Sequence, residues 1–68
     1  MTASDASYLR LHRSGWSIGD VAGGTAAGLV WLVWGSHGEN LIRAEGRTRD
    51  EAWRAAELQA LGLGMLRR

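Results

Sequence analysis

The stretch "GLVWLVWGSHGEN", residues 28–40, decides the fold of this chain, because an apolar run stands between glycines and then turns abruptly polar. Its continuous apolar core is residues 29–34, which is far shorter than the roughly 20 residues that a membrane-spanning helix needs. The run is short, partly β-branched and aromatic, and it lies between Gly28 and Gly35. This length and these flanking glycines are typical of a buried strand. The run therefore predicts a core strand, and we expect no membrane span.

The residues after this run predict a turn and a second strand that returns along the first. "GSHGEN", residues 35–40, is rich in turn-forming residues and has the length of a hairpin connection. In "ENLIRAEG", residues 39–46, apolar and polar residues then alternate, which predicts a strand with one solvent-exposed face. Ile42 and Ala44 share the inner face of this strand, and its outer face carries Leu41, Arg43 and Glu45.

The residues before the run predict a third strand. "GWSIGDVAG", residues 15–23, places Trp16 and Ile18 on a common face. The Gly- and Ala-rich "GGTAAG", residues 23–28, predicts the connection to the central strand. Residues 16–46 are therefore expected to form a three-stranded antiparallel β-meander.

The clearest local signal is the start of a C-terminal helix. In "TRDEAWRAAELQALGLG", residues 48–64, Thr48 and Glu51 have the spacing of a capping box, in which each side chain accepts a hydrogen bond from the other residue's backbone N–H. Gly62 or Gly64 can end the helix in a left-handed conformation, so we expect a helix over residues 48–62. At about 100° per residue, one face is mostly alanine and suits close packing on a sheet. That face consists of Ala52, Trp53, Ala56, Ala60 and Leu63.

The N-terminal segment "SDASYLRLHRSG", residues 4–15, has two interpretations. It forms either a short helix that Ser4 caps and Gly15 closes, or a strand with alternating leucines. The helix is favoured, so residues 1–14 are expected to be a helix or an arm. The chain, residues 1–68, is then one small α+β domain of order α-β-β-β-α, with the helices packed on one face of the sheet.

Composition narrows the classes of function. The 68 residues include no cysteine, so neither a disulfide framework nor a thiolate metal site can form. All eight basic residues are arginines, and a net charge of +1 lacks the strong basic excess of dedicated nucleic-acid binders. The N-terminus has an acid before any base and no long apolar run, so we expect no signal peptide and a cytoplasmic protein.

The side chains that could do chemistry form no recognised motif. Two histidines far apart in the sequence have no known ligand spacing for a metal. A histidine in a Gly-rich hairpin is most often a solvated turn residue. We therefore expect no enzyme, no cofactor, no metal and no small-molecule ligand. The residues considered are His12, Asp20, His37, Glu39, Asn40 and Glu45.

The tryptophans indicate an interaction surface. Trp31 and Trp34 fall on opposite faces of the central strand, so both cannot face one core. Two assignments stay open, because Leu32 and Trp34 lie either under the helices or outside them. In both cases an apolar patch is exposed unless the N-terminal segment folds over it, and such patches mark partner sites. We expect a protein partner, a second copy of the chain included, but no membrane. The candidate contact residues are Leu29, Trp31, Val33, Trp34, Leu41 and Arg43.

The stretch "AEGRTRDEAWRAAELQALGLG", residues 44–64, resembles the last strand and final helix of the double-stranded RNA-binding domain, whose layout is also helix, three-stranded meander, helix. "GENLIRAEGRTRDEAW", residues 38–53, is also similar to the endings of small bacterial proteins of unassigned activity. The first resemblance implies the same fold and an alternative function, nucleic-acid binding, which the nearby charges of Glu45, Asp50 and Glu51 would weaken. The arginines concerned are Arg43, Arg47, Arg49 and Arg54.

Overall fold

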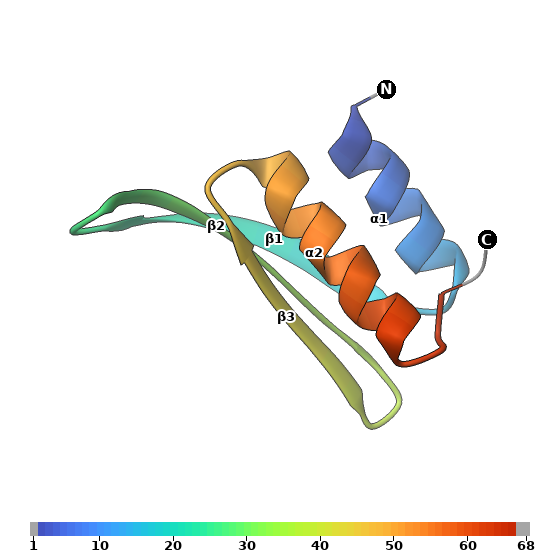
Figure 1. Cartoon of the computed structure of the whole chain (residues 1–68). Coiled ribbons are helices and arrows are strands. Elements are labelled where there is room, and N and C mark those ends of the chain that lie inside the picture. Colours follow the sequence, from blue (N-terminus) through green and yellow to red (C-terminus); the bar gives the residue numbers. More distant parts are fainter. Residues whose placement is uncertain (1, 67–68) are drawn as a thin grey trace.

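The computed structural model describes residues 2–66, which form an α+β fold of order α-β-β-β-α (Figure 1). This confirms the fold class expected from the sequence. The three strands pair in the order β1-β2-β3, and both pairs are antiparallel. The elements are α1 (Ala3–Arg13), β1 (Ser17–Thr25), β2 (Gly28–His37), β3 (Asn40–Gly46) and α2 (Arg49–Gly62).

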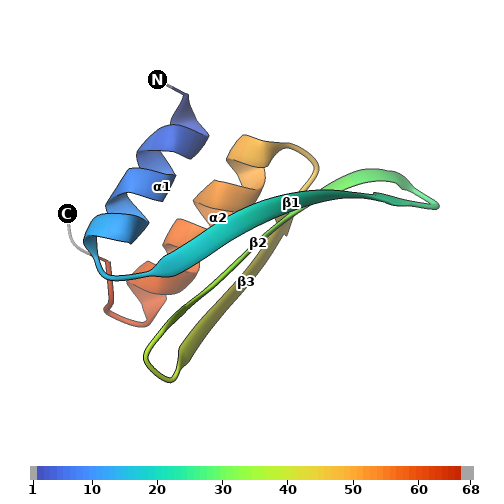
Figure 2. The same ribbon diagram turned by 180° about the vertical axis from the view of Figure 1, so that it is seen from behind.

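Both helices lie on the same face of the sheet, side by side and parallel to each other (Figures 1 and 2). α2 packs on β2 and β3, and α1 packs against α2 and contacts β1. The parallel direction follows from the contacts of Ser4 with Asp50 and of Arg10 with Glu57. The sheet therefore has a covered face, under the helices, and an open face on its other side.

Helix α1 confirms the favoured interpretation of the N-terminal segment, but its cap is Thr2 and not Ser4. The Thr2 hydroxyl accepts a hydrogen bond from the Asp5 N–H at 3.2 Å, and the Asp5 carboxylate accepts one from the Thr2 N–H at 3.3 Å. Ser4 instead lies buried inside the first turn, where its N–H donates to Asp50 of α2 at 2.9 Å. The sequence pattern placed Ser4 at the cap, just before the helix. In the structure Ser4 belongs to the helix, and its N–H makes a tertiary contact with α2.

Both helices end in the same way, with a glycine in the left-handed conformation. Gly15 has a φ of 94° after α1, and Gly64 has a φ of 70° after α2, so the left-handed residue that follows the C-terminal helix is Gly64 and not Gly62, which is the last residue of the helix. After α1 the Trp16 N–H donates back to the Leu11 C=O at 3.1 Å. This cap leads directly into Trp16, which is buried in the core.

Thr48 caps α2 as expected, because its hydroxyl accepts a hydrogen bond from the Glu51 N–H at 3.1 Å. The reciprocal bond of the expected capping box is shifted by one residue. The Glu51 carboxylate accepts from the Arg47 N–H at 2.9 Å rather than from the Thr48 N–H. The helix start is therefore correct, while the second half of the predicted box is wrong.

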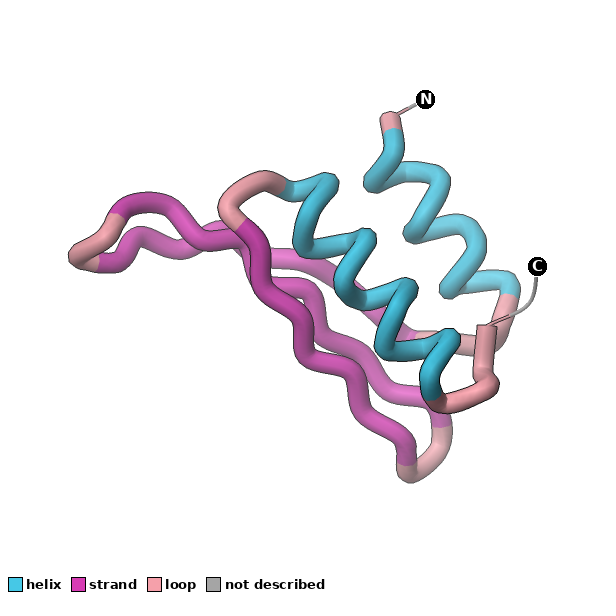
Figure 3. The backbone as a smooth tube through the Cα atoms, viewed as in Figure 1, coloured by secondary structure: helices cyan, strands magenta, loops and turns pink. Residues whose placement is uncertain are grey.

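The hairpin between β1 and β2 is longer than the sequence suggested. Residues 23–28, expected to be a connection, are mostly strand, and only residues 26–27 form the turn. The next turn is equally short, at residues 38–39. Backbone pairing needs no side chain, so the Gly- and Ala-rich segment continues the ladder. Figure 3 shows the result, an arm (residues 22–29) that projects beyond the helices.

The core lies between the covered face and the alanine side of α2. Ile42 and Ala44 are buried there, as predicted, whereas Leu63 is 47% exposed because it follows the last turn of the helix. A Cβ added at Gly46 would lie 2.5 Å from the Ala52 backbone nitrogen, so the helix backbone rests almost on the strand. The core residues are Leu11, Trp16, Val33, Ile42, Ala44, Ala52, Trp53, Ala56 and Ala60.

Candidate functional site

The open face carries a group of apolar side chains, named here the apolar patch. Side chains alternate along β2, so the burial of Val33 under the helices places Leu32 and Trp34 on the open face. Trp34 is 50% exposed, and Leu41 of β3 is 76% exposed. Adjoining exposed apolar groups, unlike scattered ones, are typical of contact surfaces. The apolar patch consists of Val21, Val30, Leu32, Trp34 and Leu41.

The strand register brings these side chains together. Val21 of β1 stands opposite Leu32, and Trp34 stands opposite Arg43, on neighbouring rows of the open face. A shallow hollow of about 350 Å³ lies among these four side chains. Its walls are mainly hydrocarbon with one guanidinium, so it suits an apolar side chain from a partner.

Arg43 and Glu45 give the apolar patch a border with charges of both signs. The nearest nitrogen and oxygen of the two side chains are 3.8 Å apart, and the side chains are 75% and 61% exposed. An ion pair this exposed contributes little to folding. Both charges can therefore turn to the opposite charges of a partner.

Three of the six contact residues expected from the sequence lie on the other side of the strand. Val33 is fully buried, which excludes it from any surface, and Trp31 is half-buried against the core. Leu29 is 57% exposed, but it lies in the arm and shares the side of Trp31. These residues lie on the covered side because Val33 pairs with Ala44, and both side chains point toward the alanines of α2. Of the two assignments left open by the sequence, the one that leaves Trp34 outside is correct.

The N-terminal segment does not cover the apolar patch. α1 is bound to α2 through the Ser4 N–H, which donates to Asp50 at 2.9 Å, and through the Arg10–Glu57 ion pair at 2.7 Å. These contacts hold α1 on the covered face (Figure 2). Nothing between residues 2 and 66 lies over the apolar patch.

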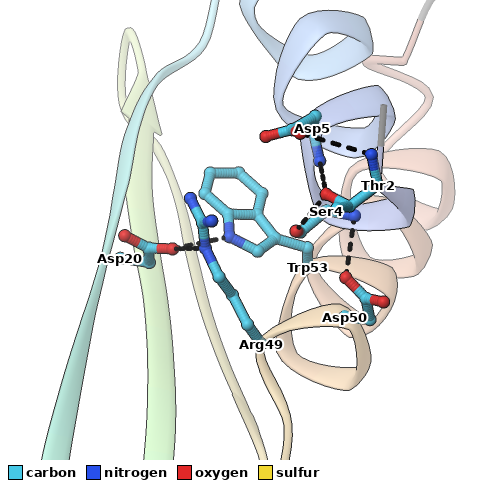
Figure 4. A network of polar contacts seen from close by, with 7 residues as sticks. All are labelled: Thr2, Ser4, Asp5, Asp20, Arg49, Asp50 and Trp53. Carbon is cyan, nitrogen blue, oxygen red and sulfur yellow. Dashed lines mark hydrogen bonds and ion pairs between the residues drawn. The ribbon is translucent and has the colours of Figure 1, made fainter.

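One polar cluster, centred on Asp20, lies on the covered face (Figure 4). The Asp20 carboxylate accepts hydrogen bonds from Trp53 Nε1 at 2.9 Å and from Arg49 Nε at 2.6 Å. Burial raises the pKa of Asp20, but these two bonds outweigh burial and hold its pKa below the ordinary value of 3.8. The cluster joins β1 to the start of α2. No local pattern in the sequence indicated it, because its members are far apart along the chain.

The four arginines of the alternative function do not share one surface. Arg43 lies on the open face, whereas Arg49 is bonded to Asp20 on the covered face. Arg47 and Arg54 are exposed near the start of α2. The sheet therefore separates Arg43 from Arg49 and Arg54.

The side chains considered for chemistry are also dispersed. His37 packs edge-on against Trp16 with ring centroids 5.5 Å apart, and His12 stacks on Tyr8 at 5.7 Å. The Asn40 side chain donates to the His37 C=O at 3.4 Å, which is a turn contact. In the described part of the chain, no three His, Asp or Glu side chains are close enough to hold a metal ion.

A second hollow, of about 610 Å³, lies between the two helices, but much of its charged lining is already paired. Arg10 contacts Glu57, and Asp50 accepts the Ser4 N–H. Burial raises the pKa of Glu57, but the hydrogen bonds from Arg10 and Ser7 and the nearby arginine charges together outweigh burial, and the pKa lies below the ordinary value of 4.5. Such a lining joins the helices and offers few free polar groups to a ligand.

Comparison of the chain with protein-family models, with curated proteins and with solved structures gives no match. No helix within residues 2–66 is long and apolar enough to cross a membrane. On the geometry alone, the apolar patch is the candidate site of this chain, because adjoining exposed apolar side chains are typical of contact surfaces.

Proposed function

We propose that this chain is a non-catalytic protein-interaction module that binds a second copy of itself through the open face of its sheet. The observation that carries the proposal is that both helices lie on one face, while the other face leaves Trp34 half-exposed beside Val21. A large apolar side chain left in water forgoes roughly 1.5–3 kcal/mol relative to burial. Covering the apolar patch therefore drives association.

A second copy suits this face because the apolar patch and its border complement themselves. Sheets that meet face to face interdigitate apolar side chains. A two-fold axis also lets Arg43 of each copy approach Glu45 of the other, and these side chains are only loosely paired within one chain. The charges on the border thereby favour a defined orientation over a random apolar contact.

The test is the mass of the protein in solution, measured by sedimentation over a range of concentrations. Trp34→Ser and Leu41→Ser should each weaken association at least about tenfold, since tenfold corresponds to about 1.4 kcal/mol, less than burial of such a side chain contributes. Leu58→Ser is the matched control, because Leu58 is 62% exposed but lies on α2. It should leave association unchanged. A wild type that is monomeric throughout, or equal effects of the Leu41 and Leu58 variants, would contradict the proposal.

Salt separates this function from the nucleic-acid alternative. Phosphate contacts release counterions, so their affinity falls steeply as salt rises, whereas an apolar contact does not weaken in this way. We expect duplex RNA to bind weakly, and only at low salt, because the arginines are divided between two faces. Sub-micromolar binding of RNA at physiological salt would favour the alternative.

A further inference from the structure

The two edges of the sheet differ in how their backbone groups are satisfied. β3 is one edge strand, and there the Gln59 side chain acts as a substitute strand. Its Oε1 accepts from the Arg43 N–H at 3.1 Å, and its Nε2 donates to the Arg43 C=O at 2.6 Å. β1 is the other edge strand, and within residues 2–66 its outer backbone groups have no partner from another residue; the Asp20 N–H is approached only by its own carboxylate. Unpaired edge groups are a template for another strand.

The bonds to Gln59 also show which backbone groups of β1 point outward. In an antiparallel sheet, the N–H and C=O groups of successive residues point alternately to the two sides. Arg43 directs both groups away from β2, so its partner Trp34 directs both toward β1 and Gly19. The residues that alternate with Gly19 therefore point outward, and they are Ile18, Asp20, Ala22 and Gly24.

This edge has few of the features that usually block strand pairing. β1 contains no Lys, Arg or Pro, and its register with β2 has no bulge. Its one charged side chain, Asp20, is held by Arg49 and Trp53 on the covered face (Figure 4). The second half of β1, residues 21–25, is exposed and runs past the helices (Figures 1 and 2).

We propose that two copies of this chain pair through their β1 strands, antiparallel and centred on Val21, to form one continuous sheet. In this register every outward residue finds a partner, because Ile18 pairs with Gly24 and Asp20 pairs with Ala22 across the two-fold axis. A register centred on Asp20 would set two carboxylates opposite each other, and like charges directly opposite are unfavourable. A register centred on Ala22 would leave Ile18 beyond the end of the ladder.

The same pairing supports the arm. A two-stranded hairpin is only marginally stable in water, and no helix covers residues 22–29. In the Val21-centred register, each arm lies beside residues 17–20 of the other copy, which run under that copy's helices. The arm thereby gains a third strand, and the open faces of both copies point the same way.

The edge contact goes beyond the proposed face contact and uses different groups. The edge pair has its two-fold axis normal to the sheet, whereas the face pair has its axis parallel to the sheet. Two perpendicular two-fold axes that intersect close an assembly of four chains, and we propose that the two axes intersect here. Each contact can therefore be removed alone, and the mass that remains tells which one was lost.

The experiment compares wild type, Ala22→Pro, Trp34→Ser and the double variant by sedimentation at high concentration. Proline at position 22 removes an outward N–H, which an edge strand tolerates, and blocks pairing. We expect four chains for wild type, two for each single variant and one for the double variant. Ala22→Ser keeps the N–H and should keep the wild-type mass.

Hydrogen exchange gives a second measurement that needs no substitution. The amides of Asp20 and Ala22 should exchange at least tenfold more slowly in the associated wild type than after dilution to single chains. A folded Ala22→Pro variant with the wild-type mass, or fast exchange of these amides in the assembly, overturns the edge contact. Loss of mass in Trp34→Ser would then still support the face contact, whereas a monomeric wild type overturns both.

Discussion

The two faces of this sheet are built from neighbouring residues of the same strands, yet they differ in burial and in polar contacts. On the covered face, Val33 is fully buried, and the carboxylate of Asp20 has two donors. On the open face, Trp34 stays half-exposed, with only a loose ion pair beside it. The comparison teaches that one strand can carry both core side chains and exposed apolar side chains, because successive side chains point to opposite sides.

The largest expected effect separates two tryptophans. Trp53→Ala should lower the free energy of unfolding by about 3–5 kcal/mol, because it opens a cavity in the core and removes a donor from Asp20. Trp34→Ala should lower it by less than about 1 kcal/mol in dilute protein. Urea melts at low concentration measure both. Similar losses would show that the open face is part of the core.

The second effect compares two strand glycines. Gly46→Ala should cost about 1–3 kcal/mol of stability, because the new Cβ would lie 2.5 Å from the Ala52 nitrogen. Gly23→Ala is the control on the open face, where an added Cβ meets no atom within 4 Å. It should be neutral, or stabilise the strand by up to about 1 kcal/mol. Equal melting curves for the two variants would contradict this difference.

The third effect is the pH dependence that Asp20 confers. The folded pKa lies below the ordinary value of 3.8, so the stabilisation is present above pH 3.8 and is lost as the pH falls through the folded pKa. Asp20→Asn should lower stability by about 1–2 kcal/mol at pH 7 and reduce the loss of stability in acid. Glu45→Gln, on the open face, should change stability by less than about 1 kcal/mol. Acid titrations followed by circular dichroism measure the stability of both variants. If Asp20→Asn loses as much stability in acid as wild type does, Asp20 does not confer this pH dependence.

The smallest effect concerns the start of the helix that covers one face. Thr48→Ala should lower stability by about 1 kcal/mol, because the Glu51 N–H loses its acceptor. Ser36→Ala, on the open face, should change stability by no more than about 0.5 kcal/mol. Thermal melts suffice for both. A Thr48 variant that melts like wild type would mean that the cap contributes nothing.

The sequence by itself determined the order of elements, the start of α2 and the inner positions of Ile42 and Ala44. These features depend on residues within a few positions of one another: a capping hydroxyl three residues before its donor, or an alternation along one strand. The arm was missed because glycine and alanine weaken the local strand signal, although Gly23 and Gly24 pair as well as any residue.

The tertiary structure alone decided which face of β2 the helices cover, and hence that Trp34 lies outside. It also decided the bonds of Asp20 to Trp53, 33 positions away, and of Gln59 to the edge of β3, 16 positions away. Residues 29–34 are apolar at every position, so the alternation of side chains along the strand does not tell which face is buried. Only the element that packs above a side chain determines whether that side chain becomes core or surface, and its identity is set by contacts between distant parts of the chain.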